Sequence, residues 1–482
     1  MFDLRPVIYV IGQMVTVLGF TMLFPLAIDL VYGNGHWTVF LQSSFIVVTI
    51  GAGMAVATFK RSRKGLSIQQ TFLLTTGVWL ALPIFGALPF TLGEPDARMV
   101  DAFFEAMSAL TTTGSTVFSG LDDLPEGVLL WRSMMQWFGG IGIIVVAMVF
   151  LPELRIGGMQ IFRSEGFDTM GKILPRAAEI ATSISTIYVA LTAVCFFAYL
   201  GTGLSEFDAI NHAFTTIATG GFSTRDASFG AFGGGAEYVA AVFMILASLP
   251  FVRYVQMVGG SSRALFTDSQ IRSFLWVLVA SILIITVYRF ATVGGAFEPL
   301  LRKSLFNVTS IVTGTGYASV DYQLWGPFAV VLFFFMGLIG GCAGSTCCSV
   351  KIFRFQLLFS AIKAQVGKIH SPHGLFSVRY EGRPVSEEVI SSVMAFFVMF
   401  IVSIGVLAVL LGTTGLDFIT SVSGAATAIA NIGPGLGDVI GPSGNFASLG
   451  DSAKWMLAAG MLIGRLELMV VYMILTVKFW RG

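Results

Sequence analysis

Four short stretches of the chain combine hydroxyl side chains with a glycine in a way that suits a cation site. Each ends in a polar residue or two and a glycine: FFEAMSALTTTG (103–114), AINHAFTTIATG (209–220), KSLFNVTSIVTG (303–314) and VSGAATAIANIG (422–433). Hydroxyl and carbonyl oxygens are the ligands that hard cations prefer. Glycine allows backbone conformations that a side chain resists, so carbonyl oxygens can be turned toward a shared point. The repetition therefore predicts one cation site built from all four stretches.

The composition places these stretches in a membrane protein. The 482 residues are 55% hydrophobic and 11% charged, whereas a soluble domain carries about 25% charged residues. The net charge of +1 gives no indication of nucleic-acid binding. Apolar runs of about 20 residues predict membrane-spanning helices. We expect ten of them, near 7–32, 38–59, 68–92, 128–150, 179–200, 236–258, 271–293, 325–349, 386–412 and 453–478.

Basic residues indicate the orientation of these spans. They gather after the even-numbered spans, at KRSRKG (60–65), at Arg155, Arg163, Lys172 and Arg176, at Arg263 and Arg272, at Lys351, Arg354, Lys363, Lys368, Arg379 and Arg383, and at Lys478 and Arg481. Loops rich in Lys and Arg lie on the cytoplasmic side. We therefore expect both termini in the cytoplasm, with the four Gly-containing stretches facing the outside.

Each stretch lies between two spans and is itself too short to cross a membrane, which is typical of a re-entrant segment. Non-helical backbone at membrane depth is tolerated only where it lines water or is buried in protein. Four parallel units of span, stretch and span can surround one axis, where carbonyl oxygens replace the hydration shell of a cation. A single TTTG would be an ordinary turn, but four in equivalent places favour a selectivity filter. The predicted fold class is all-α, with about ten spans and four re-entrant loops around one pore.

Several longer motifs resemble the Trk/Ktr/HKT superfamily of cation transporters over the full length of the chain. They are DAFFEAMSALTTTGST (101–116), QWFGGIGIIV (136–145), TTIATGGFST (215–224), IGGCAGST (339–346), ANIGPGLG (430–437) and MLIGRLE (461–467). The resemblance implies potassium uptake across the bacterial inner membrane. It also implies a homodimer and a cytosolic, nucleotide-binding regulatory ring of the TrkA-like type.

The resemblance further implies two extra N-terminal helices (1–66) and four pore repeats, at 67–178, 179–270, 271–385 and 386–482. By the same resemblance, the filter glycines are Gly114, Gly220, Gly314 and Gly433. The predicted potassium ligands are completed by their neighbours, Thr112, Thr113, Ala218, Thr219, Val312, Thr313, Asn431 and Ile432. Superfamily members that prefer sodium often carry serine at the first position, so Gly114 favours potassium.

The stretch GGCAGSTCCS interrupts the eighth expected span. Three glycines within five positions each cost roughly 1 kcal/mol relative to alanine in a helix, which predicts a broken helix or an inserted loop. In the superfamily this stretch is an intramembrane gate below the filter; the alternative is close packing of helices through small residues. The predicted gate comprises Gly340, Gly341, Cys342, Ala343, Gly344, Ser345, Thr346, Cys347, Cys348 and Ser349. The last three replace the glycines that are common in the superfamily.

Arg465 lies near the middle of the last expected span. A central arginine costs about 2.5–3.5 kcal/mol on membrane insertion and usually faces a cavity or a partner. Glu467 is two positions further on, so the two side chains do not share a helical face. We expect Arg465 in the cavity below the filter, as part of the gate; the alternative is a structural ion pair elsewhere.

The residues also limit the function classes. No cluster of His, Asp or Glu at membrane depth indicates an enzyme, and no glycine motif indicates a nucleotide site, so we expect no bound cofactor and only potassium as cargo. Membrane lipid is the expected surrounding. The alternative function is a secondary transporter that couples solute or potassium uptake to protons or sodium.

Overall fold

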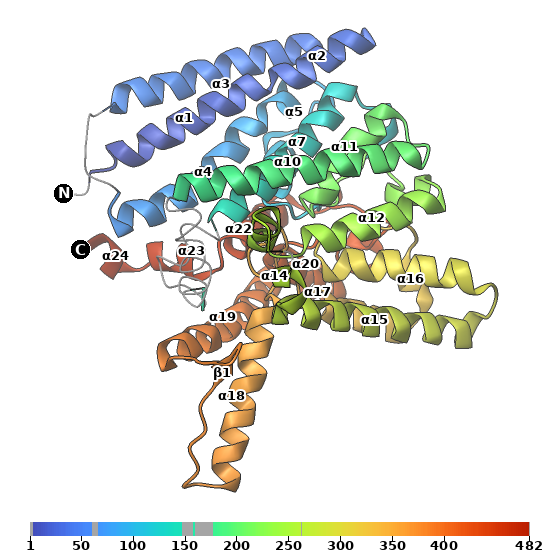
Figure 1. Cartoon of the computed structure of the whole chain (residues 1–482). Coiled ribbons are helices and arrows are strands. Elements are labelled where there is room, and N and C mark those ends of the chain that lie inside the picture. Colours follow the sequence, from blue (N-terminus) through green and yellow to red (C-terminus); the bar gives the residue numbers. More distant parts are fainter. Residues whose placement is uncertain (1–2, 60–65, 147–157, 160–176, 262, 482) are drawn as a thin grey trace.

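The computed structural model describes residues 3–59, 66–146, 158–159, 177–261 and 263–481. This part of the chain is mostly helical (Figure 1). The N-terminal part is a helical hairpin made of α1 (Arg5–Thr21), α2 (Leu23–Tyr32) and α3 (Trp37–Thr58). A β-hairpin, β1 (Arg379–Tyr380) with β2 (Arg383–Pro384), pairs Arg379 with Pro384 and Tyr380 with Arg383.

A unit of long helix, short helix and following helix occurs four times after this hairpin. The first unit contains α4 (Ile68–Gly86), α5 (Leu88–Leu92), α6 (Met99–Leu110), η1 (Leu121–Asp123) and α7 (Glu126–Val145). The second contains α10 (Ala177–Gly201), α11 (Glu206–Ile217), η3 (Ser228–Ala231), α12 (Gly234–Ala247), α13 (Phe251–Val258) and α14 (Arg263–Thr267).

The third unit contains α15 (Ser269–Val293), α16 (Phe297–Val312), η4 (Tyr322–Trp325), α17 (Pro327–Gly337) and α18 (Ile352–His370). The fourth contains α19 (Glu387–Gly412), α20 (Phe418–Ala430), α21 (Gly437–Ile440), α22 (Asp451–Arg465), α23 (Met469–Ile474) and α24 (Val477–Arg481).

The four units close on one another through their short helices, α6, α11, α16 and α20. Each short helix packs against the helix that follows it, and that helix packs against the short helix of the next unit. The contacts between units are α7 with α11, α12 with α16, α17 with α20, and α22 with α6. The last contact joins the fourth unit to the first, so the four short helices are enclosed at the centre of the bundle.

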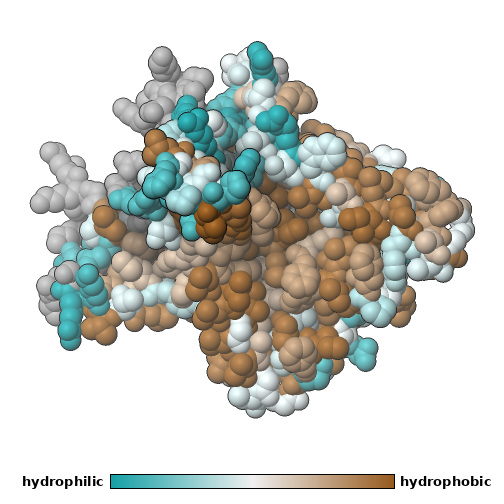
Figure 2. Space-filling view, turned by 90° about the horizontal axis from the view of Figure 1, so that it is seen from below, coloured by the Kyte–Doolittle hydropathy of each residue, from teal (hydrophilic) through white to brown (hydrophobic). Residues whose placement is uncertain are grey.

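The described helices make this a multi-pass membrane protein. Seven of them are long and apolar enough to cross a membrane, or eight if the bent pair α12 and α13 is one span. Their outer faces expose large apolar side chains, including Val31, Phe45 and Trp276, and Figure 2 shows apolar residues covering much of one face. Soluble monomers rarely expose apolar patches of this extent, so these faces contact lipid.

Within the described residues, three of the ten expected spans depart strongly from a single straight helix. The span expected at 236–258 bends by 86° between α12 and α13, where Pro250 cannot continue a helix. The span expected at 325–349 ends at Gly337, and the span expected at 453–478 breaks after Arg465. In that last break Glu467 and Leu468 adopt left-handed φ values of 58° and 52°. The count of ten spans stays a prediction.

Both termini lie on the same side of the helical bundle, whereas α18 projects away from it (Figure 1). This agrees with an even number of crossings. The basic residues expected after the second and fourth spans (60–64, 155, 163, 172 and 176) lie outside the described residues.

A buried carboxylate joins the N-terminal hairpin to the first unit. Asp29, at the end of α2, is completely buried and accepts hydrogen bonds from Gly127 N (2.7 Å) and Asn34 Nδ2 (3.0 Å). The Asn34 amide also donates to Glu126 Oε2 (2.9 Å). Gly127 lies in the first turn of α7, where unpaired backbone N–H groups favour a negative charge. Asp29 therefore fixes the hairpin against α7.

We expect Asp29→Ala to destabilise the protein by about 1–3 kcal/mol, because it leaves a buried N–H group without a partner. Thermal denaturation of detergent-purified protein, followed by size-exclusion chromatography, measures this as a lower melting temperature. Asp123→Ala removes an exposed carboxylate and serves as the matched control. Equal melting temperatures for the two variants would contradict a structural role for Asp29.

Candidate functional site

The four short helices end at the centre of the molecule, each immediately before one of the Gly-containing segments. The C-terminal residues are Leu110, Ile217, Val312 and Ala430. The last carbonyl groups of a helix carry a partial negative charge of about half an elementary charge. Four such ends directed at one place favour a cation there and disfavour an anion.

The four segments meet in a closed ring of glycine-on-carbonyl contacts. In each segment one glycine packs on a carbonyl oxygen of the next segment. That oxygen belongs to the residue just before the equivalent glycine. The pairs around the ring are Gly114 on Gly220, Gly221 on Thr315, Gly316 on Ile432, and Gly433 on Thr113. A Cβ atom at any of the first three glycines would collide with that oxygen, and a Cβ at Gly433 would lie 2.9 Å from it. We call Gly114, Gly221, Gly316 and Gly433 the glycine ring.

Backbone conformation gives the same alignment of the four segments. Each segment has two residues with positive φ, two positions apart, and the second is the ring glycine. The pairs are Thr112 and Gly114, Thr219 and Gly221, Gly314 and Gly316, and Asn431 and Gly433. A β-branched residue such as Thr112 or Thr219 rarely adopts this conformation, and such strain of about 1–3 kcal/mol concentrates at functional sites.

The structure brings all twelve predicted ion-ligand residues close to the ring, although not in the register that the sequence predicts. In segments one and four, residues 112–114 and 431–433 occupy equivalent positions. In segment two Gly220 aligns with Thr113, and in segment three Gly314 aligns with Thr112. Ala218, Val312 and Thr313 lie at the ends of the short helices α11 and α16. The sequence prediction omitted Gly221, Thr315 and Gly316, which complete the ring.

Comparison with known proteins identifies the family. Residues 36–480 match the model of the TrkH family, described as a cation transport protein. The chain belongs to the TrkH family. The Trk system potassium uptake protein TrkI of Halomonas elongata is 42% identical over 478 residues, covering 99% of this chain and 97% of that protein. The corresponding protein TrkH of Escherichia coli (strain K12) is 36% identical over 488 residues, covering 99% of each.

A solved structure supports the same assignment. The crystal structure of the potassium transporter TrkH from Vibrio parahaemolyticus covers 100% of both chains, with a TM-score of 0.91 and 32% identity. The resemblance that the sequence motifs indicated is therefore confirmed.

Side chains behind the ring hold its segments in place in this TrkH family member. Gln136 of α7 donates from Nε2 to Gly220 O (2.6 Å) and accepts from Phe222 N (3.1 Å) at Oε1. Asn431 donates to Thr113 Oγ1 (2.8 Å). These contacts join neighbouring segments of the ring. The sequence signal for Gln136 was only its place in a family motif.

The predicted gate residues form a non-helical loop, the 340–349 loop, which touches the ring segments. Thr219 Oγ1 donates to Thr346 Oγ1 at 3.1 Å. Ser349 N donates to Ala430 O (3.2 Å) at the end of α20. At the break between α12 and α13, Cys342 N donates to Ser248 O and Phe251 N donates to Gly344 O, both at 3.0 Å. The loop thus satisfies its own backbone groups and those of the broken helix.

Cys347, Cys348 and Ser349 are anchors of this loop. Cys347 Sγ donates to Ser248 Oγ (2.9 Å), and Ser349 Oγ donates to Gly337 O (2.7 Å). Cys348 Sγ accepts a hydrogen bond from Arg465. Each side chain therefore ties the loop to a different helix end.

Arg465 contacts the loop rather than a carboxylate. Its guanidinium donates to Gly139 O of α7 (3.0 Å) and Thr346 O of the loop (3.3 Å), and the side chain is almost completely buried. Glu467 instead pairs with Lys351 (2.8 Å) and with Arg354, at the end of the loop and the start of α18. No ion pair of Arg465 occurs among the described residues, so the geometry favours a place against the 340–349 loop over a structural ion pair elsewhere.

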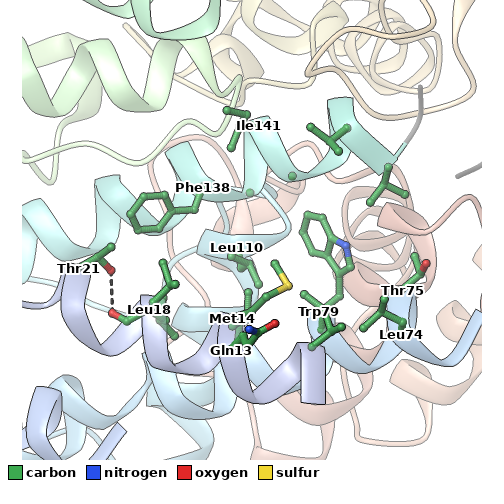
Figure 3. A pocket seen from close by; sticks show the side chains of 18 of the residues that line it. Gln13, Met14, Leu18, Thr21, Leu74, Thr75, Trp79, Leu110, Phe138 and Ile141 are labelled. Atoms are coloured by element: carbon green, nitrogen blue, oxygen red, sulfur yellow. Dashed lines mark hydrogen bonds between the residues drawn. The ribbon is translucent and has the colours of Figure 1, made fainter. Parts of the chain in front are cut away.

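A cavity of about 610 Å³ lies beside this site, between α1, α4 and α7. Figure 3 shows that its walls include Leu18, Trp79, Leu110 and Phe138. The polar Thr21 donates to a backbone carbonyl of its own helix, Leu18 O, at 2.7 Å. Apart from Gln13, Thr21, Thr75 and Ser185 the lining residues are apolar or glycine, which suits a cation poorly, so we do not include this cavity in the candidate site.

We expect Gln136→Leu to destabilise the protein by several kcal/mol, since each buried backbone group that loses its partner costs about 1–3 kcal/mol. The melting temperature of purified protein in detergent measures the loss. Gln13→Leu is the control, because it changes an exposed glutamine whose side chain, among the described residues, bonds to Tyr9. A Gln136→Leu variant as stable as this control would show that the ring segment does not depend on Gln136.

Proposed function

We propose that this chain takes up potassium across the bacterial inner membrane through a channel-like pore whose filter is the glycine ring. The single observation that carries the proposal is the closed set of glycine-on-carbonyl contacts among four segments. Relatives named as potassium uptake proteins and a structural neighbour described as a potassium transporter support the choice of ion.

The transport mechanism needs no covalent chemistry and no bound cofactor. A potassium ion entering from outside loses water, and the carbonyl and threonine oxygens of the four segments replace that water. The C-terminal ends of the short helices add favourable potential at the same place. The ion then moves down its electrochemical gradient. The chain acts as a transporter and not as an enzyme.

The proposed filter consists of residues 112–114, 219–221, 314–316 and 431–433. This set contains the four predicted filter glycines. It adds Gly221, Thr315 and Gly316, which align with predicted ligands of the other segments. Ala218, Val312 and Thr313, also predicted as ligands, would instead support the filter from the helix ends.

The proposed topology has ten crossings, four parallel repeats with the boundaries given above, four re-entrant loops and cytoplasmic termini. The enclosed short helices support the re-entrant assignment, since their 12 to 16 residues are fewer than the roughly 20 that a crossing needs. The position of both termini on one side of the bundle supports the even number of crossings (Figure 1).

The 340–349 loop and Arg465 form the proposed gate. The contact between Thr346 and Thr219 puts the loop against the filter, and Arg465 adds a buried positive charge. Opening requires the loop to leave its anchors at Ser248, Gly337 and Arg465.

The proposed partners are a second copy of the chain and a cytosolic, nucleotide-binding regulatory ring. Two features support the second of these. Helix α18 projects away from the bundle (Figure 1), and the side chains of Lys363, Lys368, Arg379 and Arg383, on α18 and the β-hairpin beside it, are exposed. The other candidate for this basic surface is anionic lipid.

Ion flux into liposomes containing the purified chain tests the function. We expect uptake of potassium and rubidium to exceed uptake of sodium, driven by the ion's own gradient. Absence of potassium flux in correctly inserted protein would refute the proposal. Flux that requires an imposed proton or sodium gradient would replace it with the coupled secondary transporter.

We expect Gly114→Ser to reduce the preference for potassium over sodium in this assay. Gly114 has φ of 86° and no room for a Cβ against Gly220 O, so serine must displace the neighbouring segment. Gly412→Ser at an open, exposed position of α19 is the control. Unchanged selectivity in a folded Gly114→Ser protein would place the ion elsewhere.

We expect Arg465→Ala to raise potassium flux a few-fold. At an effective dielectric constant of about 20, two unit charges about 8 Å apart repel by roughly 2 kcal/mol, and the variant also releases Thr346 O from the guanidinium. Lys478→Ala, at an exposed site near the C-terminus, is the control. Flux and size-exclusion profiles come from the same preparation; loss of folded protein, or unchanged flux, would contradict a gating role.

A further inference from the structure

In three of the four short helices, the side chain at one equivalent position forms hydrogen bonds with the residues that follow the ring glycine. Nine residues before each ring glycine stand Glu105, His212, Asn307 and Gly424. The first three are almost completely buried and bond to the segment beyond their own ring glycine. We call Glu105, His212 and Asn307 the braces.

The braces bond to nearly equivalent residues of their segments, although their functional groups differ. Glu105 accepts from Val117 N at 2.9 Å. Asn307 accepts from Ser319 N at 3.2 Å and donates to Ser319 Oγ at 3.0 Å. Val117 and Ser319 both lie three residues after their ring glycine.

The second and fourth segments use variants of the same contact. His212 Nε2 lies 2.9 Å from Ser223 Oγ, two residues after Gly221, while its Nδ1 lies 2.8 Å from Asp208 O. In the fourth segment glycine stands at the brace position. There the neighbouring Ser423 accepts from Leu436 N at 2.9 Å, again three residues after the ring glycine. All four segments are thus clamped between a helix end and a hydrogen bond, which is buried in the first three and partly buried in the fourth.

Arg132 of α7 links two of these clamps. Its guanidinium donates to Glu105 Oε1 (2.8 Å) and to Ser223 O (3.0 Å), and it lies over the ring of Phe222 at 4.2 Å. Phe222 directly follows ring glycine Gly221. The guanidinium therefore sets the spacing between the first and second segments, and both it and Glu105 are buried.

We infer that Arg132 and the braces are positioning residues that fix the width of the ring and thereby its preference for potassium over sodium. This inference rests on the proposed function. A smaller cation is held well only if the ring contracts around it, and contraction would break buried hydrogen bonds at the clamps. Arg132 has the largest effect, because its planar fork serves two segments at once and a lysine cannot reproduce that geometry.

The test compares potassium and sodium flux for the full chain in liposomes, normalised to folded protein. We expect Arg132→Lys to lower the potassium-to-sodium ratio about tenfold, equivalent to 1.4 kcal/mol, while potassium flux persists. Arg272→Lys, on the exposed face of α15, is the matched control. A folded Arg132→Lys protein with the ratio of this control would overturn the inference.

Two variants of His212 test the inference independently of Arg132. They apply also if the Arg132→Lys protein fails to fold. His212→Ala removes the second brace, and His212→Asn supplies the amide that serves in the third segment. We expect a clear loss of selectivity for alanine and recovery of most of it for asparagine. Wild-type ratios in both variants would overturn the inference. A wild-type protein without potassium flux would instead refute the proposed function.

Discussion

The absence of room for a Cβ atom at four glycines is the constraint on which the central structure depends. Each ring glycine lies against a carbonyl oxygen of the next segment. A closed ring of such contacts requires all four segments to reach the same depth. The lengths of the short helices, their packing against the following helices, and the bonds from Gln136 and Asn431 all serve that requirement.

The interrupted helices are a second consequence of backbone groups that need partners away from water. Broken helices at membrane depth are stable only if protein satisfies the released N–H and C=O groups. Here the break between α12 and α13 bonds to the 340–349 loop at Gly344 and Cys342. The break after α22 places Arg465 on the loop and Glu467 on Lys351 and Arg354. The breaks therefore stabilise one another.

The four units keep one geometry with different side chains. At the brace position a carboxylate, an imidazole and an amide make comparable bonds, and in the fourth unit a neighbouring hydroxyl does so. Only the ring position is glycine in every unit, because backbone contact tolerates no substitute there. The unequal surroundings give the glycine ring four distinct sides, so equivalent substitutions in different units need not have equivalent effects.

The sequence by itself determined the membrane class, most of the spans, the four Gly-containing segments and the family. Hydrophobic length and the distribution of glycine, threonine and basic residues are local properties, and they can be read without knowing any contact. The interruption at 340–349 was predicted for the same reason, from helix-breaking glycines. The sequence did not determine which glycine of each segment belongs to the glycine ring, because TGG at 219–221 and TGTG at 313–316 each contain two glycines. Only packing against the carbonyl of the next segment, Thr315 O and Ile432 O, which lies far away along the chain, selects Gly221 and Gly316. The partners of Arg465 and Glu467 were likewise decided by the tertiary structure, because buried charges bond to whatever groups the fold brings within reach.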